Sequence, residues 1–184
     1  MSDTAQLLVA IDCPADEAEL QARRAVDSLV DGGVIASETP DAVWGRVGHA
    51  PGPAFPGAVE GDIGTRPEFW AMPDGVEVET GRSFVADPSF EMSLHCPRCV
   101  TTFDTDPDEL GDAAMKWLDG DDATYYACRA CGYEQPLAEW DGPHPAGFGY
   151  LALHFWNWPP LKPEIVQALS EVIGGRIRVV WAKS

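Results

Sequence analysis

Two C-x-x-C pairs constrain the fold of this 184-residue chain more than any other feature of its sequence. Cys96 and Cys99 form the first pair, and Cys128 and Cys131 form the second, with 28 residues between them. In a cytosolic chain this spacing is typical of a zinc site rather than of a disulfide framework. Each C-x-x-C turn places two thiolates on one side of an ion, so the two turns together supply four tetrahedral ligands for one Zn²⁺.

The residues around these cysteines resemble a known module. Phe103 lies four residues after Cys99, where its ring can shield the site, and Gly132 follows Cys131 where the turn needs a positive φ. With these features, residues 93–140 resemble a zinc ribbon. The resemblance implies a structural zinc ion in a small antiparallel ribbon, and no activity, because zinc ribbons occur in proteins of unrelated function. The long acidic insert, with a short helix expected at 108–118, departs from simple ribbons.

Other interpretations of the cysteines stay open at this point. The pairs are also compatible with redox dithiols, with an iron–sulfur cluster or with no metal at all. His95 adjoins Cys96 and offers a replacement ligand. The zinc interpretation is favoured, and a closed four-sulfur site leaves no coordination position for water, so the expected zinc ion is structural rather than catalytic.

The two ends of the chain share one outline of strand, turn, helix, Gly-Gly and strand. Apolar runs predict the strands, and proline near the start and glycine at the end delimit the helices. The predicted elements are, at one end, a strand at 7–11, a helix at 14–30 and a strand at 34–36, and, at the other, a strand at 150–156, a helix ending at 173 and a strand at 176–181. An alternating segment at 75–86 predicts a hairpin.

These elements predict an α+β fold made of two βαβ-like halves. The halves suggest a ferredoxin-like arrangement, with the helices on one face of a sheet. Residues 1–92 and 143–184 are expected to form one core domain, and residues 93–142 an inserted zinc-ribbon-like module.

The charge of the chain excludes some classes of partner. Thirty acidic and twelve basic residues give a formal net charge of −18. Binding to nucleic acid is not expected, because phosphate contacts need clustered Lys and Arg, and binding to an anionic membrane surface is excluded by the same argument. No apolar run approaches the roughly 20 residues of a membrane-spanning helix. The first residues lack a basic stretch and a cleavage site, so we expect a cytoplasmic protein.

Two acidic clusters flank the helix expected in the module, and they are the candidate partner-binding residues. One interpretation is solubility, since net charge keeps molecules apart. The other is a protein partner with a basic surface, for instance a nuclease toxin that this chain would inhibit as an immunity-type protein. A calcium loop is excluded because Glu109 stands where the loop needs glycine. The clustered residues are Asp104, Asp106 and Asp108, followed by Asp119, Asp121 and Asp122.

The run FWNWPP at 155–160 adds two candidates, Trp156 and Trp158. Tryptophan gives a large contact area at low entropic cost, which favours it at binding surfaces. The competing interpretation, which we favour, is that both rings pack into the core where the strand turns toward the helix.

No familiar catalytic motif is present. The chain contains no G-x-S-x-G, no phosphate-binding G-x-x-x-x-G-K-[ST] and no H-E-x-x-H. The remaining candidate for an enzyme site is the Gly/Pro-rich segment 45–75, with His49 and acidic partners. Cys13 is expected to be a buried structural thiol. The sequence thus favours a non-enzymatic, zinc-stabilised acidic protein that binds another protein, with an enzyme of unknown reaction as the alternative.

Overall fold

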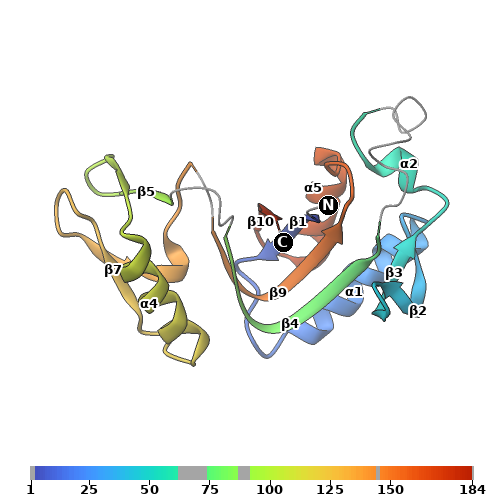
Figure 1. The fold of residues 1–184 in the computed structure, drawn as a ribbon, viewed down its shortest axis with the longest axis horizontal. Helices are drawn as coiled ribbons and strands as arrows, with labels where there is room; N and C mark the ends of the chain where they lie inside the picture. The colour runs from blue at the N-terminus through green and yellow to red at the C-terminus, as the bar shows by residue number, and fades with distance from the viewer. Residues whose placement is uncertain (1–2, 62–73, 87–91, 144–145, 184) are drawn as a thin grey trace.

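The computed structural model describes residues 3–61, 74–86, 92–143 and 146–183 and shows an α+β fold (Figure 1). Its main element is a six-stranded sheet in which every pair of neighbouring strands is antiparallel. In spatial order the strands are β10 (Ile177–Lys183), β1 (Thr4–Ala10), β9 (Gly147–Trp156), β4 (Val76–Val85), β3 (Arg46–Pro51) and β2 (Ile35–Val43). The predicted strands at 7–11, 150–156 and 176–181 are therefore confirmed as the three neighbours β1, β9 and β10.

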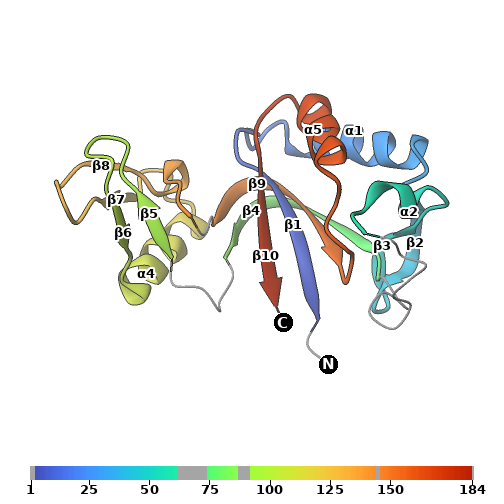
Figure 2. The ribbon, with the colours of Figure 1, turned by 90° about the horizontal axis from the view of Figure 1, so that it is seen from above.

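Helices α1 (Ala18–Asp31) and α5 (Pro163–Ile173) pack on one face of this sheet (Figure 2). On α1 the apolar residues Ala18, Ala22, Ala25 and Leu29 recur every three or four positions and are all buried. Helix α5 ends at Ile173 and is followed by Gly174, whose φ of 81° is the left-handed conformation that glycine adopts at helix ends. A short helix, α2 (Phe55–Ala58), adds Phe55 and Ala58 to the same hydrophobic core. None of the helices in the described residues is long and apolar enough to cross a membrane.

The two βαβ-like halves are not equivalent in the structure. In the second half, β9 and β10 are parallel to each other and flank β1, as in a split βαβ unit. In the first half, the strand expected at 34–36 begins β2, which lies at the edge of the sheet with β9, β4 and β3 between it and β1. The predicted α+β fold with helices on one face of a sheet is thus confirmed, whereas the arrangement of two equivalent βαβ-like halves is not.

The hairpin predicted at 75–86 is wrong, because this segment forms the single strand β4. The strand pairs with β9 from Val76 opposite Phe155 to Val85 opposite Gly147. A bulge between Thr80 and Ser83 interrupts the register, and Gly81 within it has a φ of 116°. The polar Thr80–Gly81 step therefore marks a bulge rather than the turn of a hairpin. The long partner strand β9 continues beyond this step and offers further hydrogen-bonding partners on both sides of it.

The cysteine module (residues 93–142) contains two small hairpins and one longer helix, at the left of Figure 1. Helix α4 begins after Asp106, whose side chain accepts hydrogen bonds from the first-turn amides, and it buries Leu110, Ala113, Ala114 and Trp117. The helix predicted at 108–118 is confirmed. The elements are β5 (Ser93–His95), β6 (Thr102–Asp104), α4 (Pro107–Leu118), β7 (Tyr125–Ala127), β8 (Glu134–Pro136) and a 3₁₀ turn at Leu137–Glu139.

Two arginines of the large sheet bind backbone carbonyls of the module and its exit segment. The buried guanidinium of Arg178 donates to the carbonyls of Trp140 (3.0 Å) and Ala146 (2.9 Å). Arg82 donates to the carbonyl of Trp117 at the end of α4 (2.7 Å) and lies over its indole ring. These contacts attach the cysteine module to β10 and β4.

Candidate metal centre and acidic surface

The two hairpins of the module present the four thiols from two similar turns. Each C-x-x-C turn is closed by a hydrogen bond from the residue after the second cysteine to the carbonyl of the first. The amide of Val100 donates to Cys96 (3.0 Å), and the amide of Gly132 donates to Cys128 (2.8 Å). Both donors adopt left-handed backbone, with φ of 59° at Val100 and 68° at Gly132. The positive φ predicted at Gly132 is confirmed, and the first turn imposes it on a β-branched residue.

The geometry of the four sulfur atoms fits a tetrahedral metal site. All four lie within 4.8 Å of one another, with 3.7 Å between the sulfurs of Cys96 and Cys131 and 3.8 Å between those of Cys99 and Cys128. A disulfide needs about 2.05 Å, so these pairs are not bonded. A zinc ion with Zn–S bonds of about 2.3 Å requires sulfurs about 3.8 Å apart. The residues present therefore match the donor set and the spacing of a four-cysteine zinc site.

Electrostatics within the cluster favour a bound cation. Hydrogen bonds from Thr101 lower the pKa of Cys99 to about 6. A backbone hydrogen bond at Tyr133 lowers the pKa of Cys131, but burial and the neighbouring cysteine sulfurs outweigh it and raise this pKa to about 12. Four thiolates at this distance repel one another unless a divalent ion compensates their charge, and metal binding displaces the remaining protons.

Most of the buried apolar residues that cluster with Cys96 and Cys128 belong to the same module. The ring of Phe103 packs edge-on against Trp140, with 5.6 Å between ring centroids. The indole nitrogen of Trp140 donates to the carbonyl of Tyr126 (3.2 Å), which fixes the ring. His95 lies at the end of β5 with its ring 3.3 Å from the hydroxyl of Thr102, and it is not part of the four-cysteine cluster.

Comparison with known proteins adds no family. No family model, curated protein or solved structure matches this chain. The function must therefore be inferred from the residues of this chain alone, and the cysteine cluster is their most specific arrangement.

Several of the acidic residues predicted to bind a partner make contacts within the molecule. Asp104 accepts a hydrogen bond from Ser93 (2.7 Å). Asp106 caps α4 through the amides of Asp108 (3.0 Å) and Glu109 (3.4 Å). These carboxylates therefore have structural roles, which their sequence pattern alone did not distinguish from a docking role.

In the second acidic cluster, Asp119, Asp121 and Asp122, some carboxylates make contacts within the molecule and one does not. Asp121 accepts from the amide of Ala123 (3.0 Å), which stabilises the turn after α4. Asp122 forms an ion pair with Arg82 and accepts from the hydroxyl of Tyr150 (3.1 Å), and these contacts lower its pKa. Asp119 is exposed, and among the described residues its carboxylate has no hydrogen-bond or ion-pair partner.

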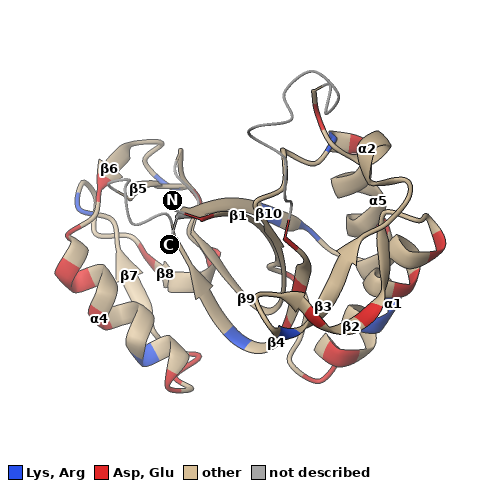
Figure 3. Cartoon of the chain, turned by 45° about the vertical axis from the view of Figure 1, so that its right-hand side comes forward, with Lys and Arg blue, Asp and Glu red and all other residues tan. Residues whose placement is uncertain are grey.

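Exposed carboxylates line a groove between α4 and β7. The groove has a volume of about 690 Å³, and Tyr125, 57% exposed, forms part of its wall. Figure 3 shows acidic residues along α4 and in the turn that follows it. Lys116 and Arg129 also line the groove, but Arg129 is already paired with Glu109 at 3.0 Å. The acidic lining consists of Glu109, Asp112, Asp121 and Glu134.

The two tryptophans of the FWNWPP run have different surroundings. Trp158 is 1% exposed and packs against Phe55 and Phe155, with ring centroids 4.4 and 5.2 Å away. A partner-binding role for Trp158 is wrong, because its ring lies in the core. Trp156 is half-buried on the opposite face of the sheet, and its indole nitrogen donates to Glu77 (3.3 Å).

The candidate enzyme site at 45–75 is only partly within the described residues. His49 lies in β3 rather than in a loop; it is 6% exposed, and its Nδ1 is 3.0 Å from the carbonyl oxygen of Ala36. Residues 62–73 of this segment lie outside the described residues. Cys13 is buried, and burial raises the pKa of its thiol, which disfavours the reactive thiolate.

Sequence reasoning missed a second groove, on the face of the sheet opposite α1 and α5. Arg46, Glu77, Glu79 and His154 contribute to its lining, which encloses about 640 Å³. Register was the missing information, because these residues come from β3, β4 and β9 and meet only after the strands pair. The signal available in the sequence was Trp44-Gly45, a tryptophan where a two-residue turn ordinarily carries Asn or Asp.

Proposed function

We propose that this chain is a non-enzymatic binding protein in which a structural zinc ion holds the cysteine module and the acidic surface of that module docks a protein with a basic surface. One observation carries the docking proposal: the groove between α4 and β7 is lined by carboxylates that the fold does not all use. Among the described residues, the side chains of Asp112 and Glu134 form no hydrogen bond or ion pair. Free carboxylates around an exposed tyrosine suit a partner that brings Lys or Arg.

Zinc supports this function by stabilising the folded cysteine module rather than by catalysing a reaction. A Cys96–Cys99–Cys128–Cys131 tetrahedron is closed, so it offers no position for a reacting water. Helix α4 begins a few residues after β6 and packs on β7, so the metal orders the two hairpins beside which the acidic groove forms.

The distribution of charge along the chain supports a docking surface on the cysteine module. Residues 93–142 carry 11 acidic and 3 basic side chains, a net charge of −8 within the −18 of the chain. Such a field raises the association rate of a cationic partner and is screened over about 8–10 Å at physiological ionic strength. The competing explanation is that the charge only keeps the protein monodisperse.

The test uses carboxylates without structural contacts. We expect the triple variant Asp112→Asn, Asp119→Asn, Glu134→Gln to fold normally and to slow association with a basic partner captured from a cell extract. A matched variant removes three exposed charges from α1 and the turn before it, through Asp16→Asn, Asp27→Asn and Asp31→Asn.

The measurement is the association rate against salt concentration for the wild type and both variants. A slower rate with a flatter salt dependence in the α4–β7 variant alone supports docking. Equal slopes in all three proteins, with increased self-association of both variants, would show that the charge serves solubility.

A further inference from the structure

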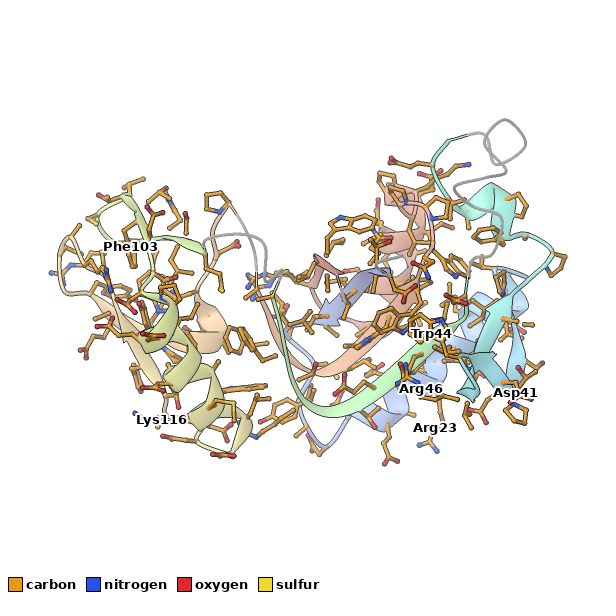
Figure 4. The ribbon with its side chains drawn as sticks, viewed as in Figure 1. Arg23, Asp41, Trp44, Arg46, Phe103 and Lys116 are labelled. Carbon is orange, nitrogen blue, oxygen red and sulfur yellow. The ribbon has the colours of Figure 1, made fainter. Side chains whose placement is uncertain are left out.

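The groove on the uncovered face of the sheet already holds a guanidinium, supplied by the chain itself. Arg46 Nη1 lies 3.0 Å from Glu77 Oε1, and its guanidinium carbon lies 5.7 Å from the centre of the Trp44 ring. Trp44 in turn packs edge-on against Trp156, with 4.8 Å between ring centroids. A carboxylate combined with an indole face is the arrangement that recognises arginine and other organic cations. Figure 4 shows Trp44 and Arg46 next to each other beside β4.

The position of Trp44 is not one that folding alone explains. Trp44 and Gly45 form the two-residue turn between β2 and β3, with φ of 47° and 76°. Asn-Gly is favoured in such turns because both residues need a positive φ, and tryptophan there is strained. The ring is nevertheless 47% exposed, so burial does not account for it. It stands beside the groove as an accessible aromatic surface.

The guanidinium of Arg46 is held loosely. The side chain of Arg46 is 52% exposed, and exposed ion pairs contribute little to stability. A second carboxylate lies nearby, since Glu79 Oε2 is 3.1 Å from His154 Nε2 and its side chain is 45% exposed. Arg82 also lines the groove, but its guanidinium is held by Asp122 and the carbonyl of Trp117. An incoming cation therefore meets two carboxylates and the indole ring of Trp156, with Trp44 at the border, and it needs to displace only the weakly held side chain of Arg46.

We propose that this groove, lined by Trp156, Glu77 and Glu79 and bordered by Trp44, binds an arginine side chain of a partner polypeptide in place of Arg46. The identity of the partner rests on the proposed function, whereas the cation-binding property of the groove does not. The charge of −18 favours the approach of such a ligand. The groove and the α4–β7 surface are separate sites, so each can be tested without the other.

The experiment titrates zinc-loaded protein with a capped tetra-arginine peptide at low ionic strength. Affinity is measured by calorimetry, and the indole N–H resonances are followed by NMR. We expect the Trp44 and Trp156 resonances to shift. Trp44→Ala should weaken binding about three- to tenfold, since it removes the ring face. Trp181→Ala is the matched control; Trp181 is 39% exposed and lies outside the groove, so this change should leave affinity within about twofold.

The direction in which Arg46→Gln changes the affinity for the peptide distinguishes a cationic from an anionic ligand. Arg46→Gln removes the internal competitor, so it should tighten peptide binding about two- to fivefold, while Glu77→Gln should weaken it about tenfold. Loss of binding in Arg46→Gln, or preferential binding of a tetra-glutamate peptide, overturns the proposal and assigns the groove to anions.

The two proposals fail separately. Peptide binding that the Asp112, Asp119 and Glu134 triple variant abolishes, without shifts at Trp44 or Trp156, retains the α4–β7 surface and rejects this groove. Peptide binding that the triple variant retains and that Trp44→Ala abolishes supports this groove and rejects the α4–β7 surface as the site of peptide binding. Absence of any peptide binding to the wild type rejects the groove as a cation site.

Discussion

Arg178 offers the sharpest test of how the cysteine module is attached to the sheet. Its buried guanidinium satisfies the carbonyls of Trp140 and Ala146, and both of these residues are buried. Burial is the main cause that lowers the pKa of Arg178, and Asp141, 3.3 Å away, opposes it. Arg178→Met keeps an unbranched apolar side chain in place of the aliphatic stem and removes the guanidinium with both hydrogen bonds.

The expected cost follows from the two carbonyls. A buried carbonyl without a donor costs about 1–3 kcal/mol, and the relief of a desolvated charge offsets part of the sum. We therefore expect Arg178→Met to lower the free energy of unfolding by about 2–4 kcal/mol, measured by urea denaturation of the zinc-loaded protein. Zinc release to a chelator should also accelerate, because Trp140 packs on Phe103 in the module core.

The control is Arg23→Met on the exposed surface of α1, which should change stability by less than about 0.5 kcal/mol. Equal stability of the Arg178 variant and this control would refute the reasoning, because it would mean that water satisfies the two carbonyls as well as the guanidinium does.

Two further substitutions test local backbone energetics in the module. Val100 is 72% exposed with a φ of 59°, so Val100→Gly should stabilise the zinc-loaded protein by about 0.5–1 kcal/mol, the relief of left-handed strain less the entropy of glycine. Gly132→Val, at the equivalent position of the second turn, should destabilise it by about 1–2 kcal/mol. Stability changes of the same sign for the two substitutions, measured by thermal unfolding, would contradict the account. Asp106→Ala should cost about 1 kcal/mol through the lost cap of α4, whereas Asp108→Ala, which leaves the cap intact, should cost less in the same assay.

The predictable parts of this fold are those that local chemistry determines. The cysteine spacing identified the cluster because a C-x-x-C turn fixes its own geometry, and the positive φ at Gly132 followed from the same turn. The helix at 107–118 was predictable from the run DELGDAAMKWL and from the Asp119-Gly120 step that ends it, whereas its cap, Asp106, had been assigned to the partner surface. These features depend on neighbours within a few residues along the chain.

The parts that failed depend on pairing between distant segments. Alternation of polar and apolar residues is the same for a hairpin and for one long strand, so only the partner β9 made residues 76–85 a single strand. The roles of Asp122 and Arg82 could not be separated from surface charge, because their contact joins residues 40 positions apart. The groove beside Trp44 was not predicted for the same reason, since its carboxylates and rings come from the paired strands β4 and β9 and from the turn after β2.

The central claim is that a zinc ion bound by Cys96, Cys99, Cys128 and Cys131 orders the module that carries the acidic surface. The most direct measurement is zinc X-ray absorption on the purified protein together with metal analysis, before and after treatment with a chelator. We predict one zinc per chain with four sulfur neighbours at about 2.3 Å, and loss of the tertiary signals of Trp117 and Trp140 when the metal is removed. A fully folded, metal-free protein with four reactive thiols would contradict the claim.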